Sequence, residues 1–180
     1  MVNGRSALFA SVAVAALSTF GDFVWAAWIP RHTMPLGIGH GALLFAAVGL
    51  ALGVRAGHAL RGAIAGAGIG AAAAVSFYVL TPVAGYAAMF PAWFGIWIAL
   101  AALASRLNRW PGRRRTVATR GLVAATGSGV AFYLISGIWR PFDPLGWDYA
   151  AHFAAWTFAF LPGFVALSTS DRGGRLPPSP

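Results

Sequence analysis

The sequence predicts an all-α integral membrane protein: one bundle of six transmembrane helices with both termini in the cytoplasm. Three observations predict it. Hydrophobic residues make up 58% of the chain and charged residues only 9%, against roughly a quarter charged in an ordinary soluble domain. The apolar residues form stretches long enough to cross a bilayer, since about 20 helical residues span its hydrocarbon core. The arginines cluster in alternate loops between these stretches, which is typical of membrane topology.

The apolar stretches divide the chain in order. The first is too long to be a cleaved signal peptide, Pro82 and Pro91 mark boundaries of the third and fourth, and the Pro-Gly pair at 111–112 marks a turn before the fifth. We expect residues 1–170 to form one domain and the Gly- and Pro-rich residues 171–180 to be a disordered tail. The predicted spans are Ala7–Ile29, Leu36–Val54, Gly62–Val83, Tyr86–Ser105, Gly121–Trp139 and Tyr149–Ser168.

The arginine distribution predicts the orientation. With six spans, both termini share a side with the second and fourth loops, and that side holds eleven arginines; the other side holds only Arg31 and Arg140. The positive-inside rule makes the arginine-rich side cytoplasmic. Lysine and glutamate are absent while Ala and Gly are abundant, a bias toward GC-rich codons. We therefore expect a bacterial inner-membrane protein.

Glycines at spacing four favour close helix packing. Gly62, Gly66 and Gly70 fall on one face of the third span, and the second span repeats the spacing at Gly37 with Gly41 and at Gly49 with Gly53. Small residues let helices approach closely inside a bilayer, where hydrophobicity does not drive association. The main interpretation is packing within one chain; a homo-oligomer seam and a surface that a ligand approaches are the alternatives.

Asp22 is the most informative single residue, because it lies inside the first apolar run and the chain has only four acidic residues. A carboxylate within a bilayer costs about 2.5–3.5 kcal/mol on insertion scales, so it should face the bundle and have a partner. We expect Asp22 to point inward and hydrogen-bond to His40. Two interpretations stay open: a polar pocket in the outer half of the bundle, or a bond that only fixes helix packing. His152 is expected at the membrane interface.

Aromatic residues are numerous, with eight Trp. Most fall near predicted boundaries as an aromatic belt, whereas Trp93, Trp97 and Trp156 lie deeper and could line an apolar cavity. The expected ligand-contacting residues are Asp22, Trp25, His40, Tyr78, Trp97 and Ser136.

Several classes of function are disfavoured. There are no cysteines, which excludes disulfides and thiolate chemistry, and no HxxxH or ExxH pair of metal ligands lies on one helix. No serine lies in a nucleophile elbow. The basic residues lie in short loops between spans, which argues against nucleic acid as a partner. We expect no cofactor, no metal and no enzymatic activity; a lipid-headgroup enzyme would need Asp22, His40, Asp148 and His152 to converge.

The last third of the chain carries a family resemblance. It reads SGIWRPFDPLGWDYAAHFAAWTFAFLPGF from Ser136 to Phe164. Gly137-Ile138-Trp139 closes the fifth span, Asp148-Tyr149 opens the sixth, and Leu161-Pro162-Gly163 lies in its middle. This stretch resembles the end of the Insig family, which has Gly-Val-Tyr and Pro-Asp-Phe at the corresponding places; Trp147 stands here where the family has proline. The resemblance extends from about Val123 to Leu167.

The resemblance implies a non-enzymatic six-helix protein that binds a sterol or other lipid in a membrane-embedded pocket and regulates a partner membrane protein. Asp148 is the position that corresponds to a partner-binding residue of the family. In a bacterial membrane a diacyl lipid is the more natural ligand. The alternative function is a small transporter or proton-coupled carrier that uses Asp22 and His40.

Overall fold

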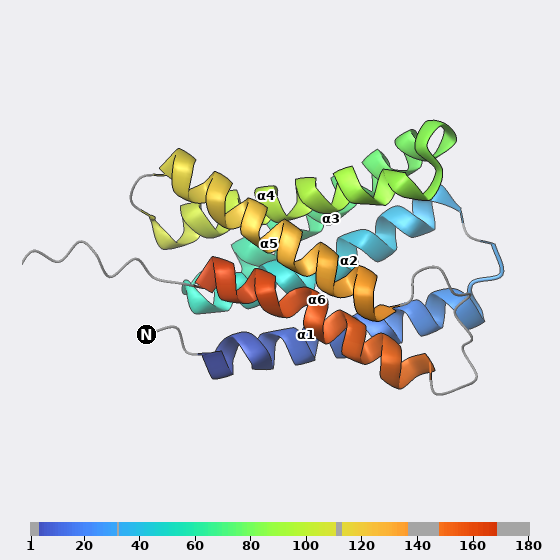
Figure 1. The fold of residues 1–180 in the computed structure, drawn as a ribbon, viewed down its shortest axis with the longest axis horizontal. Helices are drawn as coiled ribbons and strands as arrows, with labels where there is room; N and C mark the ends of the chain where they lie inside the picture. The colour runs from blue at the N-terminus through green and yellow to red at the C-terminus, as the bar shows by residue number, and fades with distance from the viewer. Residues whose placement is uncertain (1–3, 32, 111–112, 137–147, 169–180) are drawn as a thin grey trace, which may run out of the picture.

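The computed structural model describes residues 4–31, 33–110, 113–136 and 148–168, and these residues are almost entirely helical (Figure 1). The prediction of an all-helical chain with six helices is confirmed. The helices are α1 (Gly4–Trp28), α2 (Met34–Arg55), α3 (Ala59–Ala84), α4 (Met89–Asn108), α5 (Arg113–Ser136) and α6 (Asp148–Ser168), with a 3-10 turn, η1 (Gly85–Ala88), between α3 and α4.

Five of these helices, all except α5, are long and apolar enough over their described residues to cross a membrane. Helix α5 begins earlier than the predicted span. It includes Arg113, Arg114, Arg115 and Arg120, because residues 113–120 contain no proline or glycine that would interrupt a helix. The described apolar part of α5, residues 121–136, is therefore short. The tail expected to be disordered lies outside the described residues.

The helices form a ring in chain order. Each helix packs against the next one along the chain, and α6 packs against α1, which closes the ring. The start of α1 and the end of α6 lie at one end of the bundle, together with the α2–α3 turn (Figure 1); we call this the terminal end. The opposite end, where α1 ends and α2 begins, is the distal end. In the described ranges Arg31 is the one arginine near the distal end.

The closest packing is between α2 and α3. A Cβ added at Gly49 would collide with the backbone oxygen of Gly62, one at Gly66 would collide with that of Phe45, and one at Gly70 would collide with that of Gly41. Only glycine allows the two helices to approach this closely. The interpretation that the glycines pack helices within one chain is confirmed. The glycine faces of α2 and α3, which could alternatively have formed an oligomer seam, are packed against each other.

A second contact fixes α4 against α6. The indole of Trp97 on α4 is fully buried and occupies the space where a Cβ at Gly163 would lie. Its ring is 6.4 Å from that of Phe160. The α2–α3 seam and this α4–α6 contact involve different pairs of helices. The ring of six helices surrounds a cavity.

Candidate functional site

The polar centre of the molecule is Asp22, which α1 places a turn and a half before its end. Its Oδ1 lies 3.2 Å from Nε2 of His40 on α2, so the expected pair is present. Its Oδ2 lies 2.7 Å from Nε2 of His152 on α6 and accepts from Nε1 of Trp156 at 2.8 Å. The carboxylate therefore joins three helices. We call Asp22, His40, His152 and Trp156 the polar cluster.

The chemistry of the partner assigns the donors. An ionised carboxylate only accepts hydrogen bonds, so the tautomer that fits these contacts has its proton on Nε2 in both histidines. The indole nitrogen of Trp156 also lies 3.1 Å from Nε2 of His152. Because that histidine nitrogen donates to Asp22, the indole N–H is assigned to the carboxylate, which is also nearer. Asp22 keeps acceptor capacity, since a carboxylate has about four acceptor positions and these donors use three.

The chain builds the cluster through local spacing. His152 and Trp156 are four residues apart on α6, which places them on one face of the helix. Gly21 precedes Asp22 and leaves room for His40: a Cβ there would be 3.0 Å from Cε1 of the imidazole. Trp25, one turn after Gly21, packs with its ring 5.6 Å from that of His40.

A cavity of about 580 Å³ opens beside the polar cluster. Its size falls within the roughly 300–1,000 Å³ that is typical of small-molecule sites. The cavity has room because its wall includes small residues of α2 and α3, among them Gly41, Gly70 and Ala74. All six helices contribute residues to the wall. The aromatic residues on the wall are Trp25, Phe45, Phe77, Tyr78, Phe90, Trp93 and Trp156.

The expected ligand-contacting residues are placed as follows. Asp22, Trp25, His40 and Tyr78 line the cavity, and the Tyr78 hydroxyl covers Gly37. Trp97 lies in the core with no exposed surface, and Trp93, one turn earlier on α4, lines the wall instead. Ser136 and Asp148 end α5 and begin α6, but their side chains lie outside the described part of the chain.

Sequence reasoning missed the contribution of His152, which was expected at the interface. The spacing between His152 and Trp156 is the signal that could have found it, because it puts two hydrogen-bond donors on one face of an apolar helix. Of the four residues that a headgroup enzyme would need to bring together, Asp22, His40 and His152 do converge. The described part of the cavity wall contains no serine or threonine.

Metal binding finds no support in the described ranges, where no group of three or more His, Asp or Glu side chains has the geometry to hold an ion. Several serine and threonine hydroxyls bond to the carbonyl four residues earlier, as those of Ser11 and Ser18 do at 2.8 Å, which is the usual behaviour in apolar helices.

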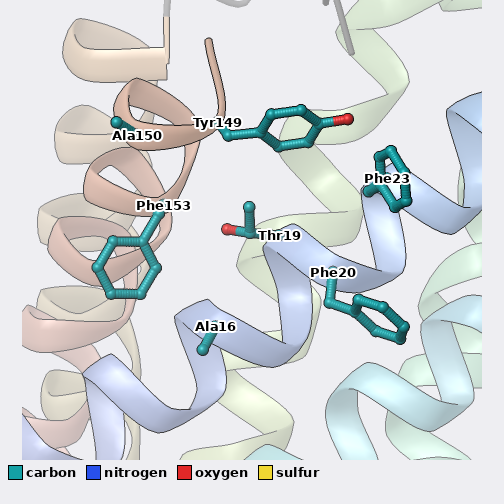
Figure 2. Close-up of a pocket in the computed structure, with 7 residues that line it drawn as sticks. All are labelled: Ala16, Thr19, Phe20, Phe23, Tyr149, Ala150 and Phe153. Carbon is teal, nitrogen blue, oxygen red and sulfur yellow. The ribbon is translucent and has the colours of Figure 1, made fainter. Parts of the chain in front are cut away.

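Two clefts flank the cavity along α1. One, of about 230 Å³ on the α1–α2 seam, shares Trp25, His40 and Leu44 with the cavity. The other is a shallow apolar depression on the α1–α6 seam (Figure 2). There the ring of Tyr149 extends from α6 toward Phe23 on α1 (Figure 2), and the ring centroids are 5.4 Å apart.

Comparison with models of known protein families, with curated proteins and with solved structures finds no match to this chain.

Proposed function

We propose that this chain is an integral membrane protein that binds a mostly apolar, amphipathic molecule in the cavity beside the polar cluster. The observation that carries the proposal is the cavity itself. It combines an aromatic and small-residue wall with one group of convergent polar side chains, Asp22, His40 and His152. Apolar pockets with a few placed polar groups are the usual form of a small-molecule site.

Membrane placement is part of the proposal. The apolar helices and the arginines at the terminal end support an orientation with both termini in the cytoplasm, as in a bacterial inner membrane. The cavity then lies in the outer half of the bilayer. Its ligand would arrive from lipid, so burial of apolar surface contributes less to affinity than the roughly 25 cal/mol per Å² found for transfer from water. Cavity shape and the polar cluster would supply the selectivity.

The proposed activity is binding and not catalysis. The donors from His40, His152 and Trp156 converge on Asp22, and the described wall offers no hydroxyl nucleophile except that of Tyr78. Membership of the Insig family and regulation of a partner membrane protein through Asp148 extend the proposal. They rest on the sequence resemblance alone.

Native mass spectrometry after extraction in mild detergents tests the proposal. We expect an adduct of one small amphiphile on the wild-type chain. Ala73→Phe should remove it, because Ala73 lines the cavity. Ala72→Phe on the next residue of α3 is the matched control, since Ala72 is exposed. Bare wild-type protein in several mild detergents would contradict the proposal, as would equal adducts on both variants.

A second candidate, a proton-coupled carrier, is favoured by one specific observation. A carboxylate and two imidazoles from three helices meet beside a cavity, and such groups form proton relays in transporters. Its test is solute flux into proteoliposomes. Asp22→Asn should abolish flux without unfolding the chain if the protein is a carrier, whereas a binding protein has no flux to lose.

A further inference from the structure

The described wall of the cavity has one carboxylate and no arginine. The carboxylate is that of Asp22, and the imidazoles of His40 and His152 are its partners on the same wall. Lysine is absent from the chain altogether. The arginines of the described helices lie at the terminal end, and Arg31, near the distal end, is exposed and not part of the wall.

The carboxylate is accessible from the cavity. About 23% of the Asp22 side chain is exposed, and 29% of the His40 side chain. The donors on Asp22 leave acceptor capacity unused. Within apolar surroundings the attraction between unit charges is several times stronger than in water, so the charge of Asp22 acts on whatever occupies the space beside it.

The aromatic residues add to the same preference. Seven of them line the cavity, and three lie on or next to the polar cluster. Trp25 packs on His40, Trp156 donates a hydrogen bond to Asp22, and the ring of Trp93 lies 6.2 Å from that of Trp156. The face of an aromatic ring attracts cations, and cages of such rings bind quaternary ammonium groups. An anion would meet a carboxylate and several ring faces, and the described part of the wall has no arginine to compensate.

We infer that the ligand of this cavity is a lipophilic organic cation, with its positive centre near Asp22 and its apolar substituents against the aromatic wall. This inference rests on the proposed function, and it names the class of molecule that the site takes. It excludes anionic amphiphiles, such as fatty acids and phosphatidic acid, as occupants of the cavity.

Tetraphenylphosphonium and tetraphenylborate provide a test, because the two ions carry the same phenyl groups and opposite charges. Titration of wild-type protein in uncharged maltoside micelles should show saturable binding of the phosphonium and no saturable binding of the borate. Asp22→Asn should weaken phosphonium binding by about tenfold or more, the usual effect of losing an interaction with a charged group. Equal affinities for the two ions would overturn the inference.

A second variant keeps the test decisive if Asp22→Asn does not fold. Phe90→Leu removes an aromatic face from the wall at a half-exposed position and should weaken phosphonium binding about two- to fivefold. Phe9→Leu is the control: Phe9 lies near the start of α1, far along the helix from Asp22, and is 76% exposed. Unchanged affinity in Phe90→Leu would count against the aromatic contribution.

Neutral triphenylphosphine oxide separates this inference from the proposed function. If the neutral probe binds saturably, loses binding in Ala73→Phe, and binds as tightly as the phosphonium, the cavity is a binding site but the preference for cations is wrong. If neither the neutral nor the cationic probe binds, the proposed function fails as well. Tighter binding of the phosphonium than of the neutral probe supports both the proposed binding function and the preference for cations.

Discussion

His152 and Asp22 are 130 positions apart in the chain, and their Nε2 and Oδ2 atoms are 2.7 Å apart. This bond joins the last helix to the first, where α6 and α1 close the ring. The same carboxylate also holds α2 through His40. Asp22 is thus both the polar centre of the cavity and the residue that connects three helices.

Removing His152 should destabilise the chain more than removing His40, because His152 makes the shorter bond to Asp22. A hydrogen bond to a charged group contributes about 1.5–3 kcal/mol, so we expect a loss in that range for His152→Ala and a smaller one for His40→Ala. Thermal unfolding in detergent micelles measures both. His58→Ala, at an exposed position before α3, is the control and should leave the melting temperature unchanged.

Gly66→Ala should destabilise the α2–α3 seam, since its new Cβ would meet the backbone of Phe45 and Gly49. Overpacking of this kind typically costs about 1–3 kcal/mol. Gly68→Ala, on the same helix, has open space around its added Cβ and should be neutral or stabilising by up to about 1 kcal/mol. Equal melting temperatures for the two variants would show that the seam is not packed as described.

Gly163→Ala should displace the buried indole of Trp97, because the added Cβ would overlap its ring. We expect a loss of about 1–3 kcal/mol and a change in tryptophan fluorescence as the ring moves. Gly95→Ala on α4, where nothing lies within 4 Å of the added Cβ, serves as the comparison. A Gly163→Ala protein with wild-type fluorescence and stability would contradict the α4–α6 contact.

Gly21→Val should push His40 away from Asp22, because even a Cβ at this position is 3.0 Å from the imidazole. The expected result is a loss of ligand affinity about as large as that of His40→Ala, with α1 still folded. The matched variant is Gly39→Val, next to His40, where the added Cβ has no neighbour within 4 Å. Histidine NMR signals report the displacement directly: they should move in Gly21→Val and stay in place in Gly39→Val.

The proposed orientation can be checked by labelling, because the chain has no cysteine of its own. A single cysteine at exposed His58, between α2 and α3, should react only from the cytoplasmic side of inner-membrane vesicles. One at exposed Ala87, in η1, should react only from the opposite side. Labelling of both positions from one side would overturn the six-span topology.

Much of the fold could be predicted from composition and spacing. Long apolar runs between arginine-rich loops predict α1, α2, α3, α4 and α6 closely, since length and hydropathy are local properties. Helix α5 is the exception, because it begins at Arg113 and not at Gly121. Glycines at spacing four predict that the second and third helices pack closely within the chain, and the structure shows that they pack against each other. The inward direction of Asp22 follows from the cost of a carboxylate in lipid.

The tertiary structure alone decided which side chains meet. The sequence pointed to His40 but not to His152 as a partner of Asp22, and it did not distinguish Trp93 on the cavity wall from Trp97 in the core. The physical reason is that these helices are apolar on every face, so hydrophobic periodicity does not tell which face turns inward. In such a bundle the rotation of each helix is set by contacts with its neighbours, and those contacts exist only once the ring from α1 to α6 has closed.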